Sequence, residues 1–420
     1  MKVLDPKELE ARRQNRVTKH KNKRRRHLVV PFLLVITAIY VAGSLIIPLP
    51  PLQLDVEDVK LSERVPVSIA WPKYGQAAVG AVGYGLLQES GEQKPLPMAS
   101  IAKVVTAVAI LKTRPMNPGD KPEIITLTSL DVGVYNRFLS EGQSVVAVED
   151  GEQLTQYQAL QALLLPSANN MADTLTRWAF GSNEEYLAFV NPFVATLGMT
   201  HTKIADSSGF SSQTVSTAAD LTKLAEIAMN NPVIAEIVGQ QQADLPVAGV
   251  VQNYNNLLGQ NGINGIKTGN TDEAGGCYLF SATRKIEGDQ SVTVVGAIMG
   301  APNRAGAIAD ALPLIDEAFK NFKVMTPIQT NQIVGKISDP GGANVPVKVK
   351  QGVTSLEWTA QEPKIEVVEN ALSYQISQGS DVGKLKVHIG NMVHEATLVA
   401  DGTIKPKSML WRIRHAGGYL

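Results

Sequence analysis

The segment SIAKVVTAVAIL, residues 100–111, is apolar on nearly every side and yet contains a lysine. This composition predicts a fully buried helix, where lysine is almost never found without a partner. Ser100 precedes Lys103 by three residues, so both side chains share one helix face. Burial lowers the pKa of an amine, and a neutral amine can accept a proton from a serine. The segment predicts a serine nucleophile with a lysine base; the alternative is a capping serine beside a lysine that extends to solvent.

Two tripeptides further along the chain are also candidates for chemistry. SAN, residues 167–169, stands between an apolar run and a helix expected from about Met171. It either projects a hydroxyl and an amide into a cleft or caps the helix. KTG, residues 267–269, lies beside two expected central strands, Gly276–Thr283 and Ser291–Met299. At a strand edge it could hold a carboxylate while a peptide pairs with the strand, or it could belong to an ordinary hairpin.

The three strings together, in this order, resemble the serine D-alanyl-D-alanine carboxypeptidases, the low-molecular-mass penicillin-binding proteins of peptidase family S11. The resemblance extends from about Gln76 to Pro302. It includes PMASIAK, LLLPSANNMA, FVNPFVATLGMTHTKIADSSGF, STAADLTKLAEIAM, NGIKTGNTDEAGGC and VVGAIMG. It implies an α/β (α+β) catalytic domain of the penicillin-binding and β-lactamase-like fold, followed by a small antiparallel β domain.

The resemblance implies a role for each matching residue. Ser100 would attack the carbonyl of the penultimate D-Ala, with Lys103 accepting its proton. Ser167 would relay a proton towards the leaving D-Ala. The backbone N–H groups of Ser100 and Asn270 would stabilise the oxyanion. The residues expected to bind the substrate are Asn169 at the peptide stem, Lys267 and Thr268 at the terminal carboxylate, and Gly269 beside them.

The implied activity is that of a carboxypeptidase that trims peptidoglycan pentapeptide stems and is inhibited covalently by β-lactams. Water would resolve the acyl-enzyme, whereas an amine acceptor would give transpeptidation. A D,D-endopeptidase acting on cross-links shares all these residues and stays an open alternative. A non-catalytic peptidoglycan-binding module would be expected to lack Ser100, Lys103 or Lys267. A class A β-lactamase needs a deacylating glutamate, and the nearest candidates, Glu184 and Glu185, open a helical pattern.

Two features depart from the family pattern. Asn270 follows the KTG string, where the family often has histidine. Because the backbone N–H is the expected donor there, the change implies tolerance with an altered substrate preference. Family members are often held to the membrane by a C-terminal amphipathic helix, whereas the tail LWRIRHAGGYL alternates more like a strand. An N-terminal membrane helix would replace that anchor.

Neither a metal nor a cofactor is expected. His201, His388, His394 and His415 lack the spacing of metal ligands. The single cysteine, Cys277, excludes an internal disulfide and every Cys-rich zinc module. Its position at the start of an apparent strand favours a buried apolar residue over a second nucleophile.

The N-terminus predicts a membrane anchor. Of 39 basic and 39 acidic residues, residues 1–27 hold eleven basic and three acidic ones, which leaves a net charge of +8 there and −8 in the rest. Leu28–Ile47 has no charged residue and would span about 30 Å as a helix. The positive-inside rule keeps the basic tail cytoplasmic and exports the remainder. A cleaved signal peptide is the alternative, and binding of nucleic acid by the basic tail is not expected.

The remainder of the chain divides into three parts. With 44% hydrophobic and 19% charged residues it is not a disordered chain. Residues 48–66 are proline-rich and predict a spacer. Residues 67–325 mix strand and helix patterns, including a buried strand at Gln76–Leu87 and a helix at Asp220–Met229 with a capping aspartate. Residues 326–420 predict a small antiparallel β domain with strands at Val345–Lys350, Lys364–Val368, Ala371–Ile376, Lys384–Ile389 and Glu395–Val399.

Overall fold

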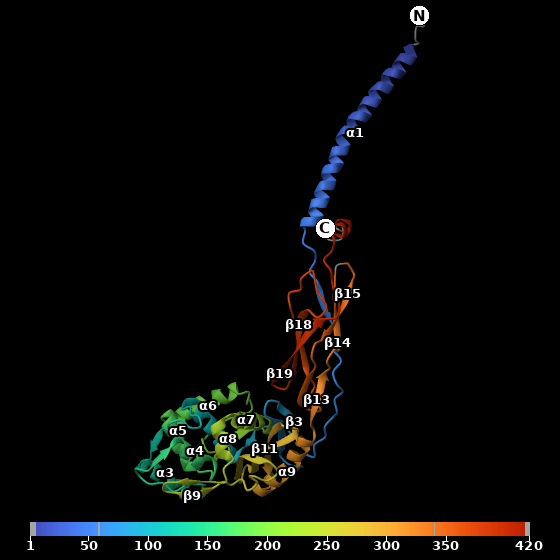
Figure 1. Ribbon diagram of the computed structural model, residues 1–420. Coiled ribbons are helices and arrows are strands. Elements are labelled where there is room, and N and C mark those ends of the chain that lie inside the picture. Colours follow the sequence, from blue (N-terminus) through green and yellow to red (C-terminus); the bar gives the residue numbers. More distant parts are fainter. Residues whose placement is uncertain (1–5, 58, 340, 416–420) are drawn as a thin grey trace.

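The molecule has three parts in a row: a long helix, a narrow β domain and a larger domain of helices and strands (Figure 1). The computed structural model describes residues 6–57, 59–339 and 341–415, without the side chains of residues 8, 9 and 17–28. The β domain lies between the other two parts, and the chain returns near its C-terminus to the end of the long helix. The sequence-based limits of the domains stay predictions.

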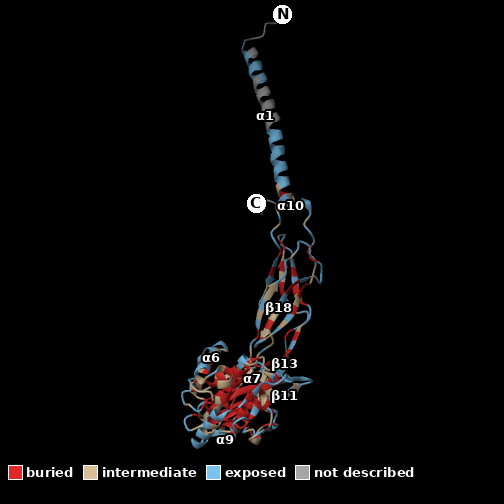
Figure 2. Ribbon diagram, turned by 90° about the vertical axis from the view of Figure 1, so that its left-hand side faces the viewer, coloured by how far each residue is buried: buried red, intermediate tan, exposed pale blue. Residues whose placement is uncertain are grey.

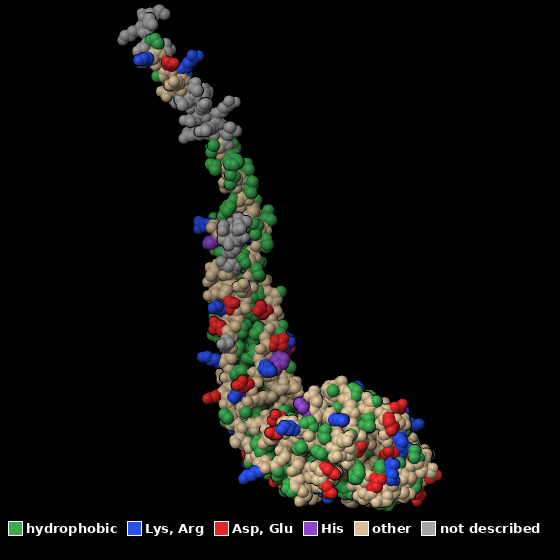
Figure 3. All heavy atoms as spheres, turned by 180° about the vertical axis from the view of Figure 1, so that it is seen from behind, with side chains coloured by type: hydrophobic (Ala, Val, Ile, Leu, Met, Phe, Trp, Pro, Cys, Tyr) green, Lys and Arg blue, Asp and Glu red, His purple; other side chains and the backbone are tan. Residues whose placement is uncertain are grey.

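Helix α1, Pro6–Ile46, contains the candidate membrane span. Its part Val29–Ile46 is long and apolar enough to cross a bilayer, and almost all of its side chains are exposed. Figure 3 shows these apolar side chains on the part of the helix that approaches the β domain. The helix includes nearly all of the predicted span Leu28–Ile47. Most of the basic side chains expected to set its orientation lie outside the described side chains.

A five-stranded antiparallel sheet forms the centre of the larger domain. In spatial order its strands are β10 (Ile263–Thr271), β11 (Gly275–Glu287), β12 (Gln290–Ala301), β2 (Gln76–Ala81) and β3 (Gly85–Ser90). β11 and β12 contain the two segments predicted to be central strands, which confirms that prediction. The predicted single strand Gln76–Leu87 is instead a hairpin. Gly83 and Gly85 have positive φ values of 85° and 72°, which glycine adopts at no steric cost and which turn the chain there.

Helices cover both faces of this sheet (Figure 2). Because successive strand residues point to opposite faces, β11 contributes to two separate hydrophobic clusters. Tyr278 and Phe280 pack in the cluster that contains α9 (Arg304–Lys320), whereas Leu279 packs in the cluster that contains α2 (Ala102–Thr113) and α7 (Ala218–Asn230).

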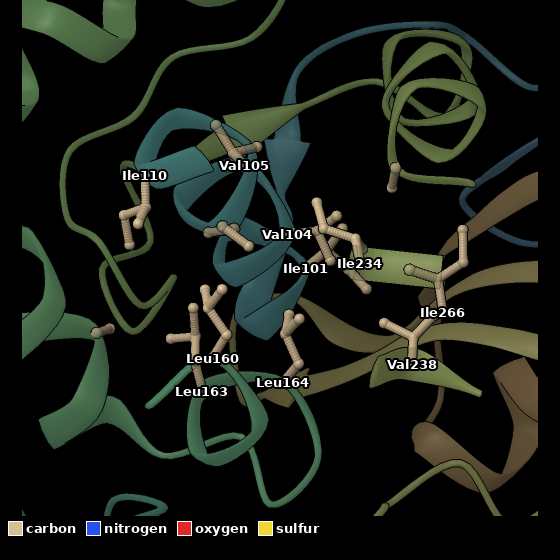
Figure 4. Close-up of a cluster of buried hydrophobic side chains, with 14 of the residues drawn as sticks. Ile101, Val104, Val105, Ile110, Leu160, Leu163, Leu164, Ile234, Val238 and Ile266 are labelled. Atoms are coloured by element: carbon tan, nitrogen blue, oxygen red, sulfur yellow. The ribbon is translucent and has the colours of Figure 1, made fainter. Parts of the chain in front are cut away.

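Helix α2 is buried on nearly all sides, as the sequence predicts. Figure 4 shows its side chain Val104, and Ile101 from the preceding 3₁₀ turn, close to Ile234, with Leu160 and Leu164 beneath the helix. The surrounding elements are η1 (Ala99–Ile101), α3 (Ser129–Ser140), α4 (Gln156–Leu164), α5 (Asn169–Phe180), α6 (Asn183–Thr196) and α8 (Pro232–Val238). The short paired strands are β4 (Leu96–Pro97) with β7 (Val215–Ser216), β5 (Ile124–Thr126) with β6 (Gln153–Thr155), and β8 (Gln242–Leu245) with β9 (Gly249–Gln252).

The cap of α7 differs from the prediction. The helix begins at Ala218, and Thr217 caps it by accepting a hydrogen bond from the backbone N of Asp220 at 3.1 Å. Asp220 therefore lies inside the first turn, and the prediction that it caps the helix is wrong. Its carboxylate accepts from the backbone N of His201 at 2.8 Å and pairs with Lys223 at 3.1 Å.

The β domain is a six-stranded antiparallel sheet next to a two-stranded one. The stretch predicted to be a spacer, residues 48–66, provides the edge strand β1, which pairs with β14, and it buries Leu52 and Leu54. The predicted strand Ala371–Ile376 is not a strand; it makes a single bridge between Ile376 and Ile404. The large sheet contains β1 (Gln53–Val56), β14 (Ile333–Ser338), β15 (Asn344–Val349), β19 (Met392–Ala400), β18 (Asp381–Ile389) and β17 (Lys364–Glu369), and the small one β13 (Phe322–Ile328) and β16 (Val353–Trp358).

The two domains are joined by an interface that includes hydrogen bonds and a buried ion pair. The hydroxyl of Tyr84, in the turn between β2 and β3, donates to the backbone oxygen of Leu356. The backbone N of Asn391, at the tip of the β18–β19 hairpin, donates to the oxygen of Gly83 at 3.0 Å. A buried ion pair joins Arg64 Nη1 and Glu357 Oε2 at 2.5 Å close to this point. The β domain is thus fixed to the sheet of the larger domain through the β2–β3 turn.

The described part of the C-terminal tail is helical where the sequence favours a strand, and residues 416–420 of that tail lie outside the described residues. Helix α10, Met409–His415, lies against the end of α1. The hydroxyl of Tyr40 donates to the oxygen of Ile413 at 2.9 Å, and Arg412 donates to the oxygen of Ile47 at 2.5 Å. The rings of Trp411 and His415 are one helical turn apart and stack at 4.3 Å, a contact that a strand would not allow.

Candidate active site

Ser100 lies in the short 3₁₀ turn η1, which leads directly into α2. Ala99 before it has a φ of 47°, a left-handed conformation that turns the chain sharply at this point. A Cβ atom on Gly209 would lie 1.8 Å from the oxygen of Ala99, so only glycine lets the neighbouring loop close over this turn. The sharp turn presents the half-buried hydroxyl of Ser100 to the site.

Lys103 is fully buried and points back at Ser100. Its Nζ is 2.9 Å from Ser100 Oγ and 3.0 Å from the backbone oxygen of Ser208. Burial lowers the pKa of this amine to about 7, while the negative charge of Asp206 acts in the opposite direction. Near neutral pH a large fraction of Lys103 is therefore uncharged and able to accept a proton.

Ser167 occupies the turn between α4 and α5 with a φ of 64°. Its Oγ is buried and has no hydrogen-bond partner within the described part of the chain. Asn169, two residues on, is the first residue of α5, and its side-chain amide donates to Gln143. Helix α5 packs against α2, which brings this turn to the side of the nucleophile's helix, although no hydrogen bond joins Ser167 to Ser100.

Strand β10 carries Lys267, Thr268 and Gly269 along the edge of the central sheet. A Cβ atom on Gly269 would lie 3.0 Å from the backbone N of Ser100, so glycine allows the strand to approach the nucleophile closely. The ammonium of Lys267 donates to the oxygen of Thr268 at 2.9 Å and is buried. Its pKa is well below the usual value, first because of burial and then because of the charges of Lys103 and Arg304.

Two functional candidates, Arg304 and Tyr254, were missed by sequence reasoning. Arg304 begins α9, its backbone N donates to Asn270 Oδ1 at 3.1 Å, and its guanidinium lies 5.2 Å from the centre of the Tyr254 ring. Its charge reaches Lys267, which places a second cation at the site. A basic residue in the first turn of a helix is unfavourable with the helix dipole, and that misfit is the one signal in the sequence that could have marked it.

These side chains include the chemical groups that acyl transfer requires. A serine hydroxyl faces an amine that is partly neutral at pH 7. The buried hydroxyl of Ser167, in the turn before the neighbouring helix α5, has no hydrogen-bond partner among the described residues. The amine of Lys267 at the strand edge and the positive charge of Arg304 on α9 together provide a place for a carboxylate. The geometry therefore matches a substrate with a carbonyl to be attacked and a negative charge close to it.

Comparisons with known proteins find relatives that are named D-alanyl-D-alanine carboxypeptidases. The model of the D-alanyl-D-alanine carboxypeptidase family matches residues 80–303. D-alanyl-D-alanine carboxypeptidase DacA of Escherichia coli K12 is 26% identical over 238 residues, which are 56% of this chain and 57% of the relative. DacF of Bacillus subtilis 168 is 24% identical over 311 residues, 72% of each chain. The chain thus spans little more than half the length of the first of these relatives.

A solved structure has the same fold. The D-alanyl-D-alanine carboxypeptidase DacD of Francisella tularensis superposes with a TM-score of 0.58 at 17% identity, over 82% of this chain and 97% of that one. At this identity the likeness concerns the fold. It establishes a penicillin-binding-like α+β domain with an additional β domain at the C-terminal side.

Proposed function

Because the chain belongs to the D-alanyl-D-alanine carboxypeptidase family, peptidase family S11, we propose that it removes the terminal D-Ala from peptidoglycan pentapeptide stems through an acyl-enzyme on Ser100. The observation that carries the proposal is the contact of 2.9 Å between Ser100 Oγ and a fully buried, partly neutral Lys103. A serine beside such an amine is an activated nucleophile.

The acylation step follows from this pair. Ser100 Oγ attacks the carbonyl of the penultimate D-Ala, and its proton passes to the neutral amine of Lys103. The backbone N–H groups of Ser100 and Asn270 stabilise the oxyanion, a contribution of about 3–4 kcal/mol for one donor in comparable sites. The close approach of Gly269 to the backbone N of Ser100 supports this pairing of donors.

Loss of D-Ala needs a proton for the departing amine. Ser167 is suited to pass that proton on, because its buried hydroxyl has no other partner among the described residues. Water then resolves the ester on Ser100. A β-lactam, whose strained amide resembles the substrate, acylates the same hydroxyl and inhibits the enzyme.

The terminal carboxylate of the stem binds at the edge of β10. Lys267 provides a buried amine, which a bound carboxylate favours in its charged form, and Thr268 provides a hydroxyl, while Arg304 adds a positive charge from the start of α9. Binding an anion there offsets the cost of burying Lys267 in its charged form, and the exposed Arg304 adds attraction from solvent. Asn169, the first residue of α5, holds the peptide stem by hydrogen bonds from its side-chain amide.

The enzyme acts outside the membrane to which α1 ties it. The apolar part of α1 crosses the bilayer once, the basic tail stays in the cytoplasm, and the catalytic domain reaches peptidoglycan on the outer side. The β domain lies between membrane and active site in this arrangement (Figure 1).

The test measures release of free D-Ala from an acyl pentapeptide by the full chain in detergent, next to Ser100→Ala. We expect release by the wild type and a loss on the order of 10⁴-fold or more in the variant, as for other serine acyl-transfer enzymes that lose their nucleophile. A penicillin adduct on Ser100 without D-Ala release, together with cleavage of a cross-linked dimer, would replace the proposal by an endopeptidase. Neither adduct nor release from folded protein would leave a peptidoglycan-binding module.

A further inference from the structure

The loop of residues 206–210 lies against Lys103, the proposed base, and is joined to α2 by two hydrogen bonds. Lys103 Nζ donates to the backbone oxygen of Ser208 at 3.0 Å, and Thr106 Oγ1 donates to the backbone oxygen of Ser207 at 2.7 Å. The two donors are one helical turn apart. Two successive carbonyl groups of the loop therefore follow the face of the helix that carries the base.

The side chain of Asp206 gives this loop its shape. One carboxylate oxygen accepts hydrogen bonds from the backbone N of Ser208 at 3.2 Å, from its Oγ at 2.7 Å and from the backbone N of Phe210 at 3.0 Å. The other accepts from Thr214 Oγ1 at 2.5 Å. All four donors are neutral, and no lysine or arginine among the described residues forms an ion pair with Asp206. Its negative charge is thus fixed in place but not neutralised.

The groups that face Lys103 come from four elements. η1 presents the hydroxyl of Ser100, and β10 presents Lys267, with Arg304 of α9 beyond it. From α6, Tyr186 approaches through Thr106, and burial raises its pKa so that its hydroxyl stays neutral. The loop presents Asp206, which supplies the negative charge of this set.

We propose that Asp206 is a positioning residue for acyl transfer. It shapes the loop so that the Ser208 carbonyl directs Lys103 towards Ser100. Its negative charge also offsets part of the free-energy cost of burying the protonated amine of Lys103. The inference rests on the proposed function and deepens it. Without Asp206, Lys103 would be neutral over a wider pH range but a weaker base. Asp206 thereby sets the pH range in which the nucleophile is active.

Asp206→Asn tests the charge, since the amide keeps the size of the side chain and an oxygen for the donors of the loop. We measure the rate of Ser100 acylation by a fluorescent penicillin against pH, with the full chain in detergent. Lys103 must be neutral to accept the proton, so the rate rises with pH through the pKa of Lys103. Removing the nearby charge lowers that pKa. We expect the rising part of the curve of acylation rate against pH, its rising limb, to move by about 0.5–1 pH unit towards acid, and the rate at its plateau to be lower.

Two control variants separate charge from shape. Thr106→Val removes the hydrogen bond to the Ser207 carbonyl but keeps Asp206. We expect a lower acylation rate, with the rising limb at the same pH as in the wild type. Asp316→Asn removes a half-exposed carboxylate on α9 that pairs with Arg284, and we expect neither rate nor limb to change. An unmoved limb in folded Asp206→Asn would overturn the proposal.

A second readout does not depend on catalysis. Titration of protein carrying ¹³Cε-lysine, with the Lys103 signal assigned by its loss in Lys103→Met, gives the pKa of this amine directly. If the wild type formed no penicillin adduct and released no D-Ala, the proposed function would fail, and the titration would still decide the inference. An acid shift in Asp206→Asn supports it, and an unchanged titration overturns it. If Asp206→Asn did not fold, the smaller uncharged variant Asp206→Ser would replace it in both measurements.

Discussion

The active site and the β domain hold buried ionisable groups in opposite ways. In the catalytic domain, Lys103 and Lys267 are buried, and their described hydrogen-bond partners are neutral oxygens. In the β domain, buried Glu357 pairs with Arg64 at 2.5 Å and buried Asp339 pairs with Lys407 at 2.7 Å. An unpaired buried charge costs stability, whereas a paired one costs much less. The active site therefore holds isolated buried amines, whereas the two buried carboxylates of the β domain each have a cationic partner.

The largest effect is expected when that isolated charge is removed. Lys103→Met takes away the base, so Ser100 acylation falls on the order of 10³-fold or more. The same variant no longer has to bury an amine, and we expect its free energy of unfolding at pH 7 to rise by about 1–3 kcal/mol, less the cost of leaving the Ser208 carbonyl unpaired. Penicillin acylation and chemical denaturation measure the two changes. A variant that loses both activity and stability would break the comparison.

The paired charge is expected to respond in the opposite direction. Glu357→Gln leaves Arg64 nearly buried with no carboxylate, and we expect a loss of about 2–4 kcal/mol in the free energy of unfolding. Since the pair lies away from the site, the rate of acylation per folded molecule stays the same. Denaturation of the full chain, with circular dichroism as the signal, gives the value. Unchanged stability would mean that this pair costs as much as it contributes.

Stability should also depend on pH through Lys103. The folded-state pKa is lowered to about 7 from the ordinary 10.5, so the unfolded chain binds the proton first as the pH falls. The contribution of Lys103 to the free energy of unfolding is most favourable above pH 10.5. It declines as the pH falls from 10.5 to 7 and reaches its lowest value below pH 7. Between pH 9 and pH 7 the loss is about 2 kcal/mol. The difference between wild type and Lys103→Met, followed over this range, isolates the contribution; a constant difference would contradict it.

The smallest effect is expected at the surface of the β domain. Lys384 Nζ and Glu395 Oε2 form a pair at 2.7 Å across two strands, and both side chains are about half exposed. Solvent and salt screen such a pair, so we expect Glu395→Gln to leave the free energy of unfolding unchanged within the error of the measurement. The same chemical substitution at Glu357 is the matched partner of this test. Equal losses at both positions would show that burial does not decide the outcome.

Local geometry explains what the sequence could reveal of the site. Ser100 and Lys103 are neighbours because a helical turn separates them, and the backbone alone sets that distance. Arg304, Tyr254 and Asp206 reach the site through contacts between distant elements, and no spacing in the chain encodes these contacts. The roles assigned to the three motifs remain predictions until the variants are measured.

In the fold, too, local patterns could be predicted from the sequence, whereas contacts between distant segments could not. β11 and β12 are long apolar strands between clear turns, so their patterns were sufficient to predict them. β1 was missed because its partner is β14, far along the chain, and its four residues have no strong alternation of their own. The C-terminal tail was predicted as a strand from alternating side chains. Contacts with α1 and the stacking of Trp411 on His415 favour the helix α10 instead.

The return of the chain to α1 has a mechanical consequence. The segment after β1 runs from the β domain to the catalytic domain, so a protease that nicks it near Lys60 breaks the only direct covalent path between α1 and β2. The catalytic domain would nevertheless stay attached, because β1 remains hydrogen-bonded to β14 and α10 remains docked on α1. Helix α1 is therefore held to the rest of the molecule by contacts as well as by the chain, and its separation after such a cut requires β1 to leave β14 and α10 to leave α1.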